Sequence, residues 1–191
     1  GLQARGEIDL AASQPNVLRI FGANPGDNVG DRMNTGDVDG DGFGDVLIGA
    51  AGCALESGID AGRVFVVFGA ADMHLREIID INRPDWDIVS IIGENAGDFL
   101  TMPFSGDVNG DGIDDIMVMA HSAVFGNRRT GGGYAIFGSK AFRSIQTIDL
   151  RNPQVKIVRI QGEDSGGYFG VSGDAGDVNG DGYEDLIMAA H

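Results

Sequence analysis

Three short acidic segments carry residue types whose spacing could bind a metal ion. Their first aspartates, Asp37, Asp107 and Asp177, are 70 residues apart (107 − 37 and 177 − 107). Counted from that aspartate, oxygen-bearing side chains stand at positions 1, 3, 5 and 9 of each segment, and position 6 is glycine. Alternating side chains can converge on one point, and the glycine lets the backbone bend around it. The segments therefore indicate a cation site that is repeated three times.

The ligand chemistry of these segments favours calcium. Oxygen ligands that are mostly anionic suit a hard cation, and calcium accepts about six to eight of them in a flexible geometry. Magnesium prefers a tighter octahedron that keeps its waters, and zinc prefers His or Cys, which the segments lack. The alternative is that each Asp-Gly is simply a hairpin turn. That alternative does not explain four spaced oxygen residues in three copies, because clustered carboxylates repel one another without a cation.

The segments begin like an EF-hand loop but end differently. An EF-hand closes with a bidentate Glu at position 12, where this sequence has Ile48, Val118 and Met188. We therefore expect position 9 to close a compact loop that joins two strands. We also expect the backbone carbonyl of position 7 to be a ligand, with its side chain pointing into the core. Position 7 is Phe43, Ile113 and Tyr183.

The sequence around the acidic segments repeats as well. Each segment is followed by a short apolar run, which indicates a strand buried on both faces. A glycine-led run, an Ile-Asp-Ile or Ile-Asp-Leu segment and a β-branched run then recur, and a final strand precedes the next acidic segment. The apolar runs are 46–51, 116–120 and 186–190, and the glycine-led runs are 62–69 and 133–138. The Ile-Asp segments are 79–81 and 148–150, the β-branched runs are 88–93 and 155–160, and the final strands are 99–105 and 168–173.

About four strands in each period of 70 residues predict an all-β protein built from β-propeller blades, each of four antiparallel strands. The apolar spacing of three and four that a helical solenoid needs is absent. A parallel β-helix is the structural alternative, although its repeat is shorter. The sequence thus predicts a propeller architecture.

We expect the blades to divide the chain into four parts. Residues 1–28 would hold the trailing strands of a preceding blade, 29–98 a blade with calcium loop 37–45, 99–167 a blade with calcium loop 107–115, and 168–191 the opening hairpin of a further blade with calcium loop 177–185. Propellers close with about four to eight blades. We therefore expect either a fragment of a longer chain or a ring that other copies complete through unpaired strand edges.

Composition excludes several classes of protein. The chain has 191 residues, with 29 acidic against 13 basic side chains and a net charge of −16, so nucleic acid is not an expected partner. At 42% hydrophobic residues it can build a core, and no run approaches the roughly 18 apolar residues of a membrane span. The single cysteine, Cys53, cannot form an internal disulfide and is expected to be a small buried hydrophobe.

The chain resembles the FG-GAP repeat. The resemblance rests on the pattern Asp-x-Asp/Asn-x-Asp-Gly-x-x-Asp, on the pair Phe169-Gly170 ahead of the third segment, and on the strand end 48–51, Ile-Gly-Ala-Ala. That repeat builds the seven-bladed propeller of integrin α-subunits and propellers of many bacterial surface and secreted proteins. The Phe-Gly pair becomes Val29-Gly30 in the first copy and is read as Phe99-Leu100 in the second. The proline that usually closes Gly-Ala-Pro is replaced by Ala51, His121 and His191.

The resemblance implies three calcium ions held by the acidic segments. The implied side-chain ligands are Asp37, Asp39, Asp41 and Asp45, then Asp107, Asn109, Asp111 and Asp115, then Asp177, Asn179, Asp181 and Asp185. The first site has four carboxylates where the others have three and an amide. We therefore expect the first site to bind calcium at least as tightly as the others, because ligand charge tunes affinity.

The resemblance also implies a function. We expect a secreted or cell-surface module whose blade loops contact an extracellular protein or a glycan, with calcium in a structural role. The alternative is the propeller portion of a secreted enzyme of the phospholipase or polysaccharide-degrading type. No convergent ionisable cluster outside the acidic segments and no known catalytic motif is evident, so the segment itself is not expected to be an enzyme. We interpret His121 and His191 as rim residues, and Trp86 as a packing residue or an exposed contact.

Overall fold

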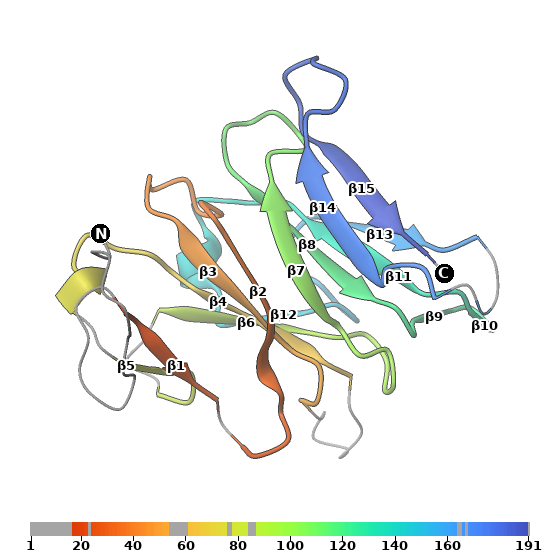
Figure 1. Ribbon diagram of the computed structural model, residues 1–191, viewed down its shortest axis with the longest axis horizontal. Helices are drawn as coiled ribbons and strands as arrows, with labels where there is room; N and C mark the ends of the chain where they lie inside the picture. The colour runs from red at the N-terminus through yellow and green to blue at the C-terminus, as the bar shows by residue number, and fades with distance from the viewer. Residues whose placement is uncertain are drawn as a thin grey trace, which may run out of the picture.

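The computed structural model describes residues 17–22, 24–53, 61–75, 78–83, 87–163, 166 and 168–190. Within these ranges the chain is made of β-strands, with only two helical turns, the 3-10 helices η1 (Met73–Leu75) and η2 (Phe142–Ser144) (Figure 1). The predicted all-β class is confirmed. Trp86, His191 and most of the segment 1–28 lie outside the described residues.

The first complete sheet has five strands in the order β12-β6-β4-β3-β2. Neighbouring strands from β2 to β6 are antiparallel, as expected for a propeller blade. The strands are β2 (Val29–Gly36), β3 (Asp45–Ala50), β4 (Arg63–Val67), β6 (Ile88–Ile92) and β12 (Thr147–Asp149).

The second sheet repeats this antiparallel arrangement in the order β13-β11-β8-β7, and a two-stranded sheet, β14-β15, follows it. Their strands are β7 (Thr101–Gly106), β8 (Asp115–Ala120), β11 (Gly132–Ile136), β13 (Ile157–Gln161), β14 (Ser172–Gly176) and β15 (Asp185–Ala189). A small exposed hairpin joins β9 (Val124–Phe125) to β10 (Arg128–Arg129). The sheets stand side by side with β7 between β2 and β14 (Figure 1), and the described strands form propeller blades that do not close into a ring.

Two short parallel pairings were not expected from the sequence, which predicted antiparallel blades alone. Strand β12, which belongs to the later repeat, pairs in parallel with the outer strand β6 of the earlier blade. Strand β5 (Ile78–Asp80) pairs in the same way with β1 (Arg19–Phe21). The central isoleucines Ile79 and Ile148 are fully buried. The pairing arises because the chain crosses onto the neighbouring blade between its third and fourth strands, where burial of an isoleucine stabilises the crossing.

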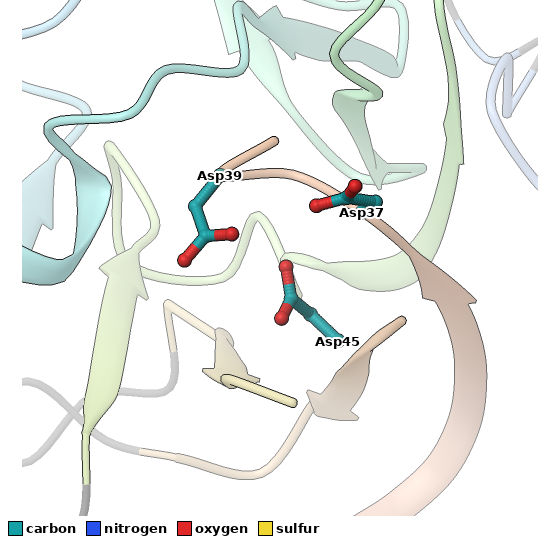
Figure 2. A group of neighbouring side chains, drawn as sticks. All are labelled: Asp37, Asp39 and Asp45. Carbon is teal, nitrogen blue, oxygen red and sulfur yellow. The ribbon is translucent and has the colours of Figure 1, made fainter. Parts of the chain in front are cut away.

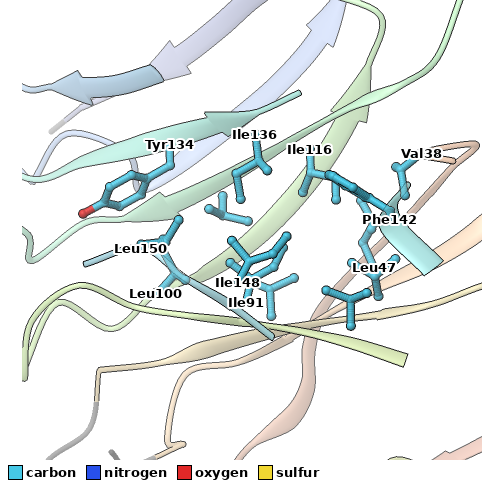
Figure 3. Packing of buried hydrophobic residues seen from close by; sticks show 14 of the residues in the cluster. Val38, Leu47, Ile91, Leu100, Ile116, Tyr134, Ile136, Phe142, Ile148 and Leu150 are labelled. Carbon is cyan, nitrogen blue, oxygen red and sulfur yellow. The ribbon is translucent and has the colours of Figure 1, made fainter. Parts of the chain in front are cut away.

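The main hydrophobic core lies between the first two blades (Figure 3). It joins side chains of both sheets, including Leu47 and Ile91 from the first blade and Ile116 and Ile136 from the second. Every residue of β8 is buried, as its apolar run predicted. Cys53 is buried too, as expected. Each complete blade therefore has apolar side chains on both faces, since separate clusters pack against their other sides.

In the second copy, Leu100 and not Phe99 corresponds to Phe169. The predicted equivalence of Phe99-Leu100 with the Phe-Gly pair is therefore wrong by one residue. Gly131 forms an isolated β-bridge with Phe169, and the corresponding glycine, Gly62, forms the same bridge with Leu100. Both bridges link neighbouring blades. The irregularity in β7, between Thr101 and Phe104, is one residue shorter than the irregularity in β2, between Val29 and Met33, so Leu100 lies one residue closer to its acidic loop than Val29 does.

Candidate metal centre

Each acidic segment forms the loop between the first two strands of a sheet. We call these loop 1 (residues 37–45), loop 2 (107–115) and loop 3 (177–185). In all three, the residue before position 1 pairs with the aspartate at position 9, as in the pair Gly36 and Asp45. The expectation of a compact loop that joins two strands is therefore confirmed, and position 9 as the closing ligand stays a prediction.

The aspartate at position 1 organises the backbone of its own loop. In loop 1 the carboxylate of Asp37 accepts hydrogen bonds from the N–H groups of Asp41, at 3.0 Å, and Gly42, at 2.9 Å. The same pair of bonds recurs in loops 2 and 3. Gly42 has a φ of +88°, which favours glycine, so the predicted bend is present. These N–H donors stabilise the charged form, and in loop 3 they lower the pKa of Asp177, the Gly182 N–H most of all.

The aspartate at position 9 is held inside the protein. Asp45 is fully buried, and its two oxygens accept hydrogen bonds from the N–H of Val38, at 2.9 Å, and the N–H of Gly69, at 2.8 Å. Burial raises the pKa of Asp45 to about 6, and the nearby carboxylates of Asp39 and Asp41 act in the same direction. A buried anion surrounded by other anions is the environment that a bound cation would stabilise.

Three carboxylates of loop 1 converge on one point (Figure 2). One oxygen from each of Asp37, Asp39 and Asp45 lies within 4.8 Å of the other two. Asp41 is not part of this group; its Oδ1 accepts a hydrogen bond from the N–H of Phe43 at 2.9 Å, and its Oδ2 contacts Arg143. The converged donors are all carboxylate oxygens, which fits the chemistry of a hard cation such as calcium.

Loops 2 and 3 have an asparagine at position 3, and its amide changes the local arrangement. Asn109 donates through Nδ2 to Asp115 at 3.0 Å, and Asn179 donates to Asp185 at 3.2 Å. Asp115 is buried like Asp45, and burial raises its pKa as well. With an amide in place of the second carboxylate, these two loops bring fewer anionic oxygens together. Their ligand sets remain predictions.

The side chains at position 7 do not point into the core, so that expectation was wrong, and in loops 2 and 3 they pack against the preceding loop. Phe43 and Tyr183 are 43% and 52% exposed. A β-carbon placed on Gly110 of loop 2 would lie 2.1 Å from the Tyr183 ring, and Gly40 is covered by Ile113 in the same way. The cause is the stacking of consecutive loops, whose backbones also hydrogen-bond from position 8 of one loop to position 1 of the preceding one.

Arg143, which the sequence did not single out, reaches loop 1 from the following repeat. Its Nε and Nη2 atoms form ion pairs with Asp39 and Asp41, and Nη2 also donates to the carbonyl of Gly69 at 2.9 Å. The guanidinium carbon lies 4.9 Å from the centre of the Phe68 ring. No local pattern could have shown this, because Arg143 is more than a hundred residues from the aspartates it contacts.

A cavity of about 430 Å³ lies at the opposite end of the inner strands from the acidic loops. His121 borders it, stacked on Phe99 at a ring distance of 6.1 Å and tilted against Tyr168 at 6.4 Å. The hydroxyl of Thr101 donates to the carboxylate of Asp31 at 3.0 Å across neighbouring blades. The full lining is Asp31, Arg32, Ala51, Thr101, Met102, His121, Tyr168 and Val171.

The antiparallel blades and their acidic hairpin loops define a repeat protein of the β-propeller type. Residues 169–191 match the FG-GAP repeat family model. The chain is therefore an FG-GAP repeat-containing protein, with partial similarity to an integrin α-subunit.

Three relatives illustrate this similarity. The chain is 30% identical to phosphatidylinositol-glycan-specific phospholipase D of Bos taurus over 194 residues, which covers 96% of this chain and 22% of that protein. The human phospholipase of the same name is 30% identical over 165 residues, covering 85% of this chain and 18% of the relative. Integrin alpha-PS2 of Drosophila melanogaster is 34% identical over 110 residues, covering 55% and 7%. The chain thus spans less than a quarter of each of these relatives.

None of the helices in the described ranges has the length and apolar character needed to cross a bilayer.

Proposed function

We propose that this chain is a calcium-binding β-propeller module of a secreted or cell-surface protein, with one ion in each acidic loop. The convergence of Asp37, Asp39 and Asp45 within 4.8 Å carries the proposal. Burial raises the pKa of Asp45, and the neighbouring carboxylates of Asp39 and Asp41 raise it further, so a cation would stabilise the charged form of this group. The same residue pattern at the same hairpin position in loops 2 and 3 extends the proposal to three sites.

The role of calcium in this proposal is structural. Each loop joins the two innermost strands of a blade, and consecutive loops contact one another through position 7. An ion that neutralises one loop therefore stabilises both its own blade and the contact with the next blade. Weak binding, with a dissociation constant of about 10⁻⁴ to 10⁻³ M, is typical of extracellular calcium modules. That range would suit a secreted or cell-surface location, which the similarity to an integrin and to phosphatidylinositol-glycan-specific phospholipase D supports.

For the module itself we propose binding of an extracellular protein or glycan, with no catalytic step in this segment. The cavity beside His121 supports this because it combines aromatic rings with a carboxylate on one open surface. A second candidate function is the non-catalytic propeller of a secreted phospholipase. The observation that favours it is the alignment of 96% of this chain with the bovine phospholipase D.

The calcium proposal can be tested by thermal unfolding with calcium titrated from chelator to 10 mM and with magnesium as the control. A site with a dissociation constant tenfold to a hundredfold below the calcium concentration adds about 1.4 to 2.7 kcal/mol to the free energy of unfolding. We expect this gain for calcium, and we expect its loss when the position 1 aspartates Asp37, Asp107 and Asp177 are all changed to Asn. Asp174→Asn, outside the loops, is the matched control. An equal gain with magnesium, or a gain retained by the triple variant, would refute the proposal.

A further inference from the structure

The 3-10 helix η2 carries Arg143, and core packing and a backbone hydrogen bond hold this helix beside loop 1. Phe142, the residue before it, is fully buried in the core that also contains Val38 of loop 1. The N–H of Ser139, just ahead of η2, donates to the carbonyl of Val38 at 3.1 Å. The backbone that carries Arg143 is therefore fixed against the loop of the preceding repeat, and its position does not depend on the ion pairs.

The guanidinium of Arg143 already occupies oxygens that a calcium ion would use. It contacts the Oδ2 atoms of Asp39 and Asp41, which stand at positions 3 and 5 of loop 1. The side chain of Asp39 is only 2% exposed, so this pairing takes place largely away from water. Asp41 is held outside the group formed by the other three carboxylates. For calcium to gain all four carboxylates, the guanidinium must release at least Asp41.

The charges at the ligand positions of the loops also indicate that Arg143 acts as a counter-charge for loop 1. Loop 1 has four carboxylates at its ligand positions, and loops 2 and 3 have three and an amide. Arg143 contributes one positive charge beside the ligand positions of loop 1, which brings the summed charge at those positions level with the charge at the same positions of the other two loops. A released guanidinium also has acceptors close by, since the carbonyl of Gly69 is 2.9 Å away and the carboxylate of Asp87 is 3.8 Å away.

We propose that Arg143 is a built-in counter-cation of loop 1 that competes with calcium and thereby lowers the calcium affinity of that site. The proposal rests on the proposed calcium-binding function. Binding at loop 1 is then coupled to the contact between the first two blades, because the competing charge comes from the neighbouring repeat. The proposal opposes the expectation, drawn from charge count alone, that the first site binds at least as tightly as the others, and that expectation stays a prediction.

A calcium titration followed by NMR at single amides tests this. The N–H groups of Gly42, Gly112 and Gly182 each donate to the position 1 aspartate of their own loop, so each reports on one site. In Arg143→Met, which keeps an apolar side chain against Phe68, we expect the midpoint at Gly42 to move to about tenfold lower calcium. We expect the midpoints at Gly112 and Gly182 to stay where they are.

Two further variants separate competition from a general change of charge. Arg151→Met removes one positive charge from an arginine that is paired with Asp149, 2.6 Å away, and should leave the Gly42 midpoint unchanged. Arg143→Lys keeps the charge but loses the planar fork of donors, and should give an intermediate shift. A Gly42 midpoint in Arg143→Met that is unchanged or moves to higher calcium would overturn the proposal, because Arg143 would then only position Asp39.

A measurement on the wild-type chain covers the case in which Arg143→Met does not fold. The Nε–H resonance of Arg143 should shift with the same midpoint as the Gly42 amide when calcium is added. A resonance that stays fixed while Gly42 responds overturns the competition alone. If none of the three glycine amides responds to calcium up to 10 mM, the proposed calcium function fails, and this proposal fails with it.

Discussion

The bridge between neighbouring blades at Gly131 gives a sharp test of the architecture. Gly131 has a φ of +68°, and a β-carbon added to it would lie 2.3 Å from the carbonyl oxygen of Phe169 and 2.8 Å from that of His121. An alanine there would cost about 1 to 2 kcal/mol in the left-handed conformation. Opening the bridge to relieve the clash would lose about two hydrogen bonds, each contributing about 1 kcal/mol. We therefore expect Gly131→Ala to destabilise the chain by about 3 to 4 kcal/mol.

The matched control is Gly126→Ala in the adjoining hairpin. Gly126 has a φ of +63°, but no atom lies within 4 Å of an added β-carbon. It should cost only the conformational term of about 1 to 2 kcal/mol. Denaturant unfolding at fixed calcium would measure both variants, and the difference of about 2 kcal/mol corresponds to about 4 to 8 °C in melting temperature. Equal destabilisation by the two variants would refute the close approach of blades at Gly131.

Three further predictions concern pH and packing. Burial raises the pKa of Asp45 from 3.8 to about 6, so the folded calcium-free protein binds a proton at Asp45 more tightly than the unfolded chain does. This linkage adds up to about 3 kcal/mol to the free energy of unfolding. The contribution is fully present below about pH 4 and is lost as the pH rises through about 6. Urea unfolding in chelator should show this loss in wild type and not in Asp45→Asn, and identical pH slopes would contradict it. Tyr134→Phe removes the hydroxyl that donates to Glu94 at 2.9 Å and should cost about 1 to 2 kcal/mol in urea unfolding, whereas an unchanged stability would exclude a net contribution from that bond. Phe142→Ala should lower the free energy of unfolding by about 3 to 5 kcal/mol because it leaves a cavity in the core. The control Leu75→Ala, at a side chain in η1 that is 73% exposed, should change it by less than about 0.5 kcal/mol. Similar losses in both variants would show that Phe142 does not anchor η2.

Each repeat has one of its elements docked on the neighbouring blade, and this explains why calcium and blade contacts are linked in the proposals. Strand β12 lies on the outer edge of the earlier blade, η2 lies against loop 1, and Ile113 covers Gly40. A change in one acidic loop therefore acts on residues of two repeats. Calcium binding in this arrangement would stabilise the contact between blades as well as the hairpin that holds the ion.

The sequence by itself determined the features that depend on residues close together in the chain. The aspartate at position 1, the glycine at position 6 and the aspartate at position 9 lie within nine residues, and the bonds that Asp37 accepts from Gly42 and Asp45 accepts from Val38 form inside one hairpin. The apolar runs that follow the loops predicted buried strands, because a short run without polar residues can only be accommodated between two layers. The repeat and the all-β class were readable for the same reason.

The tertiary structure alone decided the contacts between repeats. Arg143 meets Asp39 across 104 residues, Leu100 forms a β-bridge with Gly62 of the neighbouring blade, and the position 7 side chains of loops 2 and 3 cover the preceding loop. These contacts depend on how one blade is seated against the next, which is set by packing of buried side chains from both blades. Residue spacing within a single repeat does not determine how neighbouring blades pack. The charge of loop 1 could therefore be counted from the sequence, but the arginine that pairs with that loop could not be identified from it.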